Sequence, residues 1–115
     1  MITVNDIRQI AMRLPHVEER PSYGGRPSWR CGPRMFAWVR TEPEALVIWV
    51  DTIEDKHALC DEAPDRFFTT SHYDNHPVVL VRLDTIDIDE ATELIADSWR
   101  TRAPKKHLQA LTSEE

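Results

Sequence analysis

The 115-residue sequence has only two cysteines, three glycines and no long hydrophobic run. Two isolated cysteines, Cys31 and Cys60, exclude a disulfide framework. The longest apolar run, Ala45 to Val50, has six residues and is too short to cross a bilayer. The first residues, MITVNDIRQ, lack the basic and then apolar stretches of a signal peptide. We therefore expect a cytoplasmic protein with no membrane partner.

Motifs for catalysis are also missing. The sequence has no phosphate-cradling glycine-rich loop, no G-x-S-x-G and no HExxH. His72 and His76 have a spacing that suits two metal ligands on a helix, but Pro77 and the Asp74-Asn75 turn argue against a helix there. The cysteines would act as nucleophiles only if their surroundings lowered the thiol pKa. We expect no enzymatic activity, no cofactor and no metal site.

Charge is unevenly distributed along the chain. The net charge is −6, with +4 over residues 1–40, −12 over residues 41–98 and +2 over residues 99–115. An acidic protein with basic ends can bind nucleic acid if folding brings both ends to one face. The same pattern also fits an ordinary solvated surface.

Two segments, residues 3–14 and 87–102, have the apolar periodicity of amphipathic helices. The apolar positions are Ile7, Ile10, Ala11 and Leu14 in the first, and Ile88, Ala91, Ile95 and Trp99 in the second. Thr3 and Asp87 are suitable helix caps. The range Thr52–Asp61 predicts a shorter helix.

Extended segments lie between these helices. We predict strands at Ser28–Cys31, Arg34–Arg40, Ala45–Val50, Phe67–Thr69 and Val78–Leu83. Residues 16–33 are rich in Pro and Gly, which favours short extended pieces joined by turns. This order predicts an α+β fold, a two-layer sandwich with an antiparallel sheet and helices on one face. A single domain is expected over residues 1–111, with a last helical turn at 105–111 and a loose tail at 112–115.

Three stretches of the sequence, PSWRCGPRMFAWV, FFTTSHYDNHPVVLVRLDTID and ELIADSWRTRAPKKHL, resemble the MmcQ/YjbR family. The resemblance extends over about residues 4–110. It implies a frataxin-like (CyaY-like) fold, with the N- and C-terminal helices side by side on one face of the sheet. It also implies a non-catalytic DNA-binding protein that uses paired wing-like hairpins, and it supplies no base-reading motif.

Seven basic residues are candidates for nucleic-acid binding: Arg26, Arg30, Arg34, Arg100, Arg102, Lys105 and Lys106. Binding to a duplex needs several cations that reach phosphates together. No zinc-finger, helix-turn-helix or RNP signature is present. DNA binding is therefore expected to be mainly phosphate-directed, with weak sequence specificity.

An alternative function is a binding module for a protein or a small ligand. The strands at Arg34–Arg40 and Ala45–Val50 are apolar on both faces, so Trp38 and Trp49 need cover on the face away from the helices. With His72, Tyr73 and Arg82 they are candidates for a ligand groove. Arg82, in an apolar strand, needs either a carboxylate or a place in such a groove. A third hypothesis, metal handling by analogy with frataxin, requires clustered carboxylates.

Overall fold

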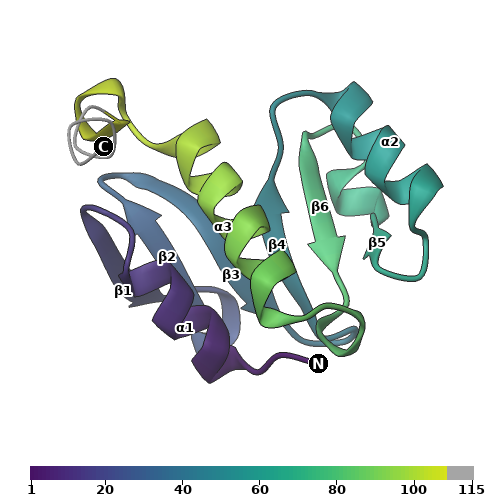
Figure 1. The fold of residues 1–115 in the computed structure, drawn as a ribbon, viewed down its shortest axis with the longest axis horizontal. Helices are drawn as coiled ribbons and strands as arrows, with labels where there is room; N and C mark the ends of the chain where they lie inside the picture. The colour runs from purple at the N-terminus through teal and green to yellow at the C-terminus, as the bar shows by residue number, and fades with distance from the viewer. Residues whose placement is uncertain (109–115) are drawn as a thin grey trace.

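The computed structural model describes residues 1–108, and in this range the chain forms one antiparallel sheet with helices packed against it (Figure 1). The strands lie in the order β1-β2-β3-β4-β6-β5, so β6 lies between β4 and β5. The helices and strands in chain order are α1 (Val4–Met12), β1 (Val17–Pro21), β2 (Pro27–Cys31), β3 (Arg34–Arg40), β4 (Ala45–Trp49), α2 (Ile53–Glu62), β5 (Phe67–Phe68), β6 (Val78–Val81) and α3 (Ile88–Arg102). Three 3₁₀ turns, η1 (Tyr23–Gly25), η2 (Ser71–Tyr73) and η3 (Leu83–Thr85), lie in the connections.

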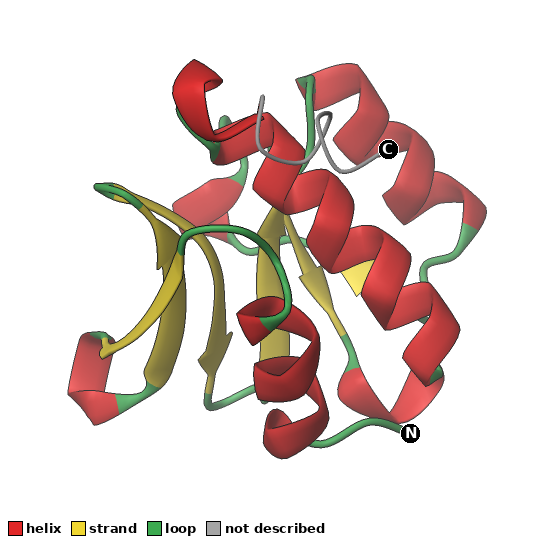
Figure 2. Cartoon of the chain, turned by 60° about the vertical axis from the view of Figure 1, so that its left-hand side comes forward, coloured by secondary structure: helices red, strands yellow, loops and turns green. Residues whose placement is uncertain are grey.

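The two terminal helices lie side by side on one face of the sheet, as Figure 2 shows. The main core fills the space between them and the strands, and Trp29, Trp99 and Phe36 are fully buried there. The Trp99 indole donates a hydrogen bond to the Pro15 carbonyl, 3.1 Å away, so α3 is joined to the segment that follows α1. The predicted α+β sandwich, with both terminal helices on one face, is confirmed.

Short polar side chains start the helices as the sequence predicts. Thr3 and Asp6 form a reciprocal capping box at the start of α1. Thr52 caps α2 by accepting from the Asp55 amide, and Asp87 caps α3. Each cap satisfies backbone N–H groups that have no partner inside the helix. Helix α2 lies at the β5–β6 edge of the sheet, away from α1.

One buried hydroxyl joins α3 to a gap in the sheet. The β2–β3 register shifts between Trp29 and Arg30, which leaves Phe36 as an extra residue on β3. Pairing of β3 with β4 ends at Ile48, one residue before Trp49. The Ser98 hydroxyl occupies this gap, donating to the Phe36 carbonyl at 2.5 Å and accepting from the Trp49 amide at 2.9 Å.

The face of the sheet away from α1 and α3 is called here the open face. A second apolar cluster, built on Val47, Leu80 and the mostly buried Trp38, lies on it. Tyr73 of η2 packs against this cluster, so the connection between β5 and β6 provides its cover. The sequence left open whether a loop, a ligand or a partner covers Trp38. In the structure, a loop contributes.

Strand β1 is the element that the sequence analysis did not predict. It reads Val-Glu-Glu-Arg-Pro, and four of its five residues are exposed. An edge strand with polar side chains lacks the apolar alternation that identifies a strand. At the other end of the chain, residues 105–108 form a helical turn. The remainder of the predicted 105–111 turn and the predicted 112–115 tail lie outside the described residues. Within residues 1–108, no helix is both long and apolar enough to span a bilayer.

Candidate functional site

Arginines from two strands and from the end of α3 meet on the open face. Arg30 on β2 and Arg40 on β3 alternate with core residues, so both point away from α1 and α3. Arg26, just before β2, donates from Nε to the Val39 carbonyl at 3.2 Å. Arg102, at the end of α3, donates from Nε to the Met35 carbonyl at 2.9 Å. These two hydrogen bonds anchor two of the guanidinium groups on β3.

The two basic ends of the chain meet beside the β2–β3 turn. Arg34 donates to the Arg102 carbonyl at 3.4 Å. Burial, and secondly the nearby Arg34 cation, lower the pKa of Arg102. Gly32, with a φ of +62°, forms the turn and leaves only contact distance to Pro104 and His107. The exposed Lys105 and Lys106 belong to that same segment.

Arg100 is separated from the other predicted phosphate ligands. It forms an ion pair with Asp97 at 2.8 Å and lines a second hollow, of about 540 Å³, between α2 and α3. Asp51 and Asp55 also line this hollow. Its acidic surroundings make it unsuitable for an anion. The structure therefore removes Arg100 from the predicted nucleic-acid surface.

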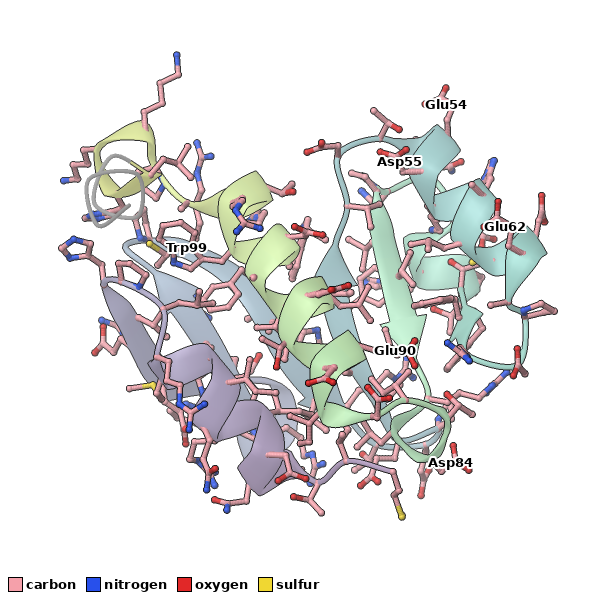
Figure 3. The ribbon with its side chains drawn as sticks, viewed as in Figure 1. Glu54, Asp55, Glu62, Asp84, Glu90 and Trp99 are labelled. Atoms are coloured by element: carbon pink, nitrogen blue, oxygen red, sulfur yellow. The ribbon has the colours of Figure 1, made fainter. Side chains whose placement is uncertain are left out.

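Ion pairing distinguishes the open face from the rest of the molecule. Arg8, Arg66 and Arg100 each pair with a carboxylate within 2.9 Å. Four cations have no carboxylate partner among residues 1–108: Arg30, Arg34, Arg40 and Arg102. The acidic residues labelled in Figure 3 lie on α2, on η3 and at the start of α3, away from these cations.

A pocket of about 560 Å³ lies between the end of β3 and η2, and it is called here the β3–η2 pocket. It combines cationic, aromatic and hydroxyl side chains, and its lining is Arg26, Trp38, Arg40, Thr41, Thr70, Ser71, His72 and Tyr73. Two buried polar atoms of the lining, Arg40 Nε and Thr70 Oγ1, have no hydrogen-bond partner within residues 1–108. Its volume is typical of small-molecule sites.

A buried lysine holds the wall of this pocket in place. Lys56 on α2 is 1% exposed, and its ammonium donates to the carbonyls of Tyr73 and His76. Burial lowers the pKa of Lys56, and the negative charge of Asp74 partly offsets this. The sequence gave no indication of this role, because a lysine among acidic helix residues is typical of a solvated helix surface.

The predicted ligand groove is therefore only partly correct. Trp38, His72 and Tyr73 line one pocket, but Trp49 lies under Arg102, with 4.8 Å from the guanidinium carbon to the ring centroid. Arg82 follows β6 and lies over the Phe68 ring at 4.1 Å. The expectation that Arg82 needs a carboxylate or a groove is wrong, because the aromatic face holds the cation instead.

The sequence analysis also missed two residues of the pocket, Arg40 and Thr70. Arg40 was open to prediction, since it follows Trp38 by two residues on one strand and therefore shares its face. Thr70 was not, because only the fold of the β5–β6 connection carries it to β3.

A histidine pair joins the C-terminal segment to the loop before β1. The rings of His16 and His107 lie 4.1 Å apart. Partial burial, His16 and Lys106 all lower the pKa of His107. Because the folded pKa lies below the ordinary value of 6.5, the unfolded chain binds more protons just below pH 6.5. Attachment of residues 104–108 is therefore expected to weaken as the pH falls through that window.

An NMR titration tests this pH dependence. The His107 ring is expected to titrate below 6.5 in the wild-type protein, and closer to 6.5 in a His16→Asn variant. Asn is chosen because residue 16 has a φ of +59°, which Asn tolerates better than most residues. An unchanged His107 pKa in the variant would contradict the pairing.

The thiols and the carboxylates do not form a reactive site in the described part of the chain. Burial raises the pKa of both Cys31 and Cys60, which keeps the thiols protonated at neutral pH. No group of three or more His, Cys, Asp or Glu side chains in residues 1–108 is arranged to hold a metal ion. The clustered carboxylates that the metal-handling hypothesis requires are not found there.

Comparison with known proteins gives consistent matches. A family model described as YjbR matches residues 12–101. The uncharacterised proteins Rv2570 of Mycobacterium tuberculosis and Mb2600 of Mycobacterium bovis are each 33% identical to this chain, with 96% of the chain and 95% of the relative aligned. The crystal structure of Deinococcus radiodurans protein DR2400, a DUF419 domain, superposes with a TM-score of 0.73 and 29% identity, covering 86% of this chain and 77% of that one. Together with the confirmed fold, these matches show that the chain belongs to the YjbR family.

Proposed function

We propose that this protein is a non-catalytic, cytoplasmic nucleic-acid-binding protein that contacts phosphates with the arginines of its open face. The observation that carries the proposal is the contrast in ion pairing. Arg30, Arg34, Arg40 and Arg102 lie on or beside the open face without a carboxylate partner in residues 1–108, whereas Arg8, Arg66 and Arg100 elsewhere are paired. Unpaired guanidinium groups gathered on one face attract a polyanion.

The placement of Arg34 beside Arg102 supports the same function. Two like charges brought together disfavour the folded state unless an anion neutralises them. Lys105 and Lys106 add mobile cations to this end of the face, next to the β2–β3 turn. The resulting basic strip runs from Lys106 and Arg34 past Arg30 towards Arg26.

The geometry favours contacts to phosphates over contacts to bases. Helices α1 and α3 pack against the sheet, so neither is available to enter a major groove. Arg26 and Arg30 are four residues apart along an extended segment, which separates them by about 13 Å. Cations at such intervals along one strand can follow a nucleic-acid backbone.

Salt dependence of binding tests this proposal. Fluorescence anisotropy is measured with labelled single-stranded and duplex DNA at about 50 and 200 mM salt. Four phosphate contacts to a single strand give a logarithmic slope of about −2.8, so affinity is expected to fall by about 50-fold over that range. Absence of binding at the lower salt concentration would overturn the proposal.

Variants locate the surface. The triple change Arg34→Gln, Lys105→Gln and Lys106→Gln removes three exposed cations, and it should reduce the slope on a single strand by about 2. The matched control is Arg100→Gln, since Arg100 is paired with Asp97 and faces the acidic hollow. Equal slopes for the triple variant and the control would show that the strand binds elsewhere.

A further inference from the structure

The β3–η2 pocket has polar groups that the protein leaves without partners. Arg40 Nε and Thr70 Oγ1 are buried, yet neither has a hydrogen-bond partner within residues 1–108. A buried polar group without a partner destabilises a protein, so native structures rarely keep one without a reason. Both groups belong to side chains that line the same pocket. A ligand that accepts hydrogen bonds would satisfy both.

The charge of the pocket selects an anion. Its lining contains two guanidinium groups, Arg26 and Arg40, and no carboxylate. The nearest ion-pairing partner is the exposed Glu44, whose carboxylate lies 4.0 Å from Arg26. Hydroxyls of Thr41 and Ser71 add further donors to the lining. Arginine forks and several hydroxyls suit the multiple acceptor oxygens of a phosphate better than the two oxygens of a carboxylate.

Aromatic side chains select a ring attached to that phosphate. Trp38 and Tyr73 line the pocket, and both also belong to the apolar cluster of the open face. His72 packs edge-on against Tyr73, with 4.7 Å between ring centroids. Flat aromatic surfaces beside cations are typical of sites that stack nucleobases.

The pocket is held in shape before any ligand arrives. Arg26 is fixed by its hydrogen bond to the Val39 carbonyl, and the η2 wall is fixed by Lys56. A site that is ordered in advance loses less conformational entropy when it binds a ligand.

We propose that the β3–η2 pocket binds a phosphate ester of a planar ring, with the size and chemistry of a mononucleotide. The guanidinium of Arg40 and the hydroxyl of Thr70 bind the phosphate, and the ring lies against Trp38 and Tyr73. The ligand is either a free nucleotide or a terminal, unpaired nucleotide of a strand. This site does not depend on a longer strand binding to the rest of the open face.

Titration of the wild-type protein with adenosine 5′-monophosphate, adenosine and inorganic phosphate, followed by NMR, tests the proposal. The nucleotide should shift resonances of residues 70–73, and adenosine and phosphate should each bind at least about tenfold more weakly, since each lacks half of the contacts. Equal binding of adenosine and its monophosphate, or no binding of the nucleotide at millimolar concentration, would overturn the proposal.

Two isosteric variants distinguish the pocket from its neighbourhood. Thr70→Val removes the unpartnered hydroxyl and keeps the shape, so it should weaken nucleotide binding about tenfold, the loss of one charge-assisted hydrogen bond. The same change should leave the melting temperature equal to or above that of the wild type. Thr69→Val, at an exposed position outside the pocket lining, is the matched control and should bind as the wild type does. Unchanged binding by Thr70→Val would contradict the assignment.

A short single strand with and without a 5′-phosphate distinguishes the two sources of the ligand. Tighter binding of the phosphorylated strand, lost in Thr70→Val, would assign the pocket to strand ends. Equal binding of the two strands would restrict the site to free nucleotides. Because the mononucleotide titration needs no strand, failure of the pocket and failure of the nucleic-acid proposal remain distinguishable.

Discussion

Replacing Ser98 with alanine is expected to lower the free energy of unfolding by about 2–4 kcal/mol. The Ser98 side chain is fully buried and joins two strands where their own pairing has ended. Its loss leaves the Phe36 carbonyl and the Trp49 amide buried without partners. Each unsatisfied group costs about 1–3 kcal/mol, a large fraction of the roughly 5–15 kcal/mol that stabilises a domain of this size.

Urea unfolding followed by tryptophan fluorescence measures this effect. The control is Thr92→Ala on the same helix, because the Thr92 hydroxyl is exposed and bonds only to the Ile88 carbonyl one turn earlier. The control should change stability by no more than about 0.5 kcal/mol. A Ser98→Ala protein as stable as the control would mean that the two strands satisfy these groups in another way.

Replacing Lys56 with methionine is expected to lower stability by about 1–3 kcal/mol and to abolish the order of the β3–η2 pocket. Methionine keeps the length of the side chain but cannot donate hydrogen bonds to the Tyr73 and His76 carbonyls. Relief from burying the ammonium offsets part of this loss. Amide hydrogen exchange over residues 70–77 should accelerate, and nucleotide binding should weaken.

The pH dependence of Lys56→Met gives an independent check. The folded pKa of Lys56 lies below its ordinary value of 10.5, so between these two values the unfolded wild-type chain binds more protons than the folded one. Wild-type stability therefore rises with pH in that window, and the variant lacks this contribution. The stability difference between the two proteins should grow as the pH rises towards 10.5.

An exposed position on the same helix provides the control for Lys56. Glu54→Gln changes a charge on α2 without touching the η2 wall, and residue 54 is exposed. Hydrogen exchange over residues 70–77 should match the wild type in this variant. Equal exchange in Lys56→Met and Glu54→Gln would show that η2 is held by its other contacts.

Short-range patterns in the sequence determined the helices, most strands and the fold class of this protein. Helix caps such as Thr3 and the spacing of Ile88 to Trp99 act over one or two turns, so they can be recognised without knowledge of the fold. The same holds for the alternation that makes Arg34–Arg40 a strand. The polar edge strand β1 lacked such a pattern and was missed.

The resemblance to a family extended this to the layer arrangement, but not to the site. It placed both terminal helices on one face of the sheet, as the structure has them. It gave no indication that Arg100 would pair with Asp97 and that Arg40 and Thr70 would share a pocket.

Only the tertiary structure decided which of the basic and aromatic residues meet. Arg34 and Arg102 are 68 residues apart in the chain, and α3 crossing the sheet brings them together. Lys56 reads as a solvated helix residue until the β5–β6 connection folds over it and supplies its carbonyl partners. Periodicity records which side of an element is apolar, whereas contacts between distant elements depend on register and crossing geometry, which no local pattern encodes.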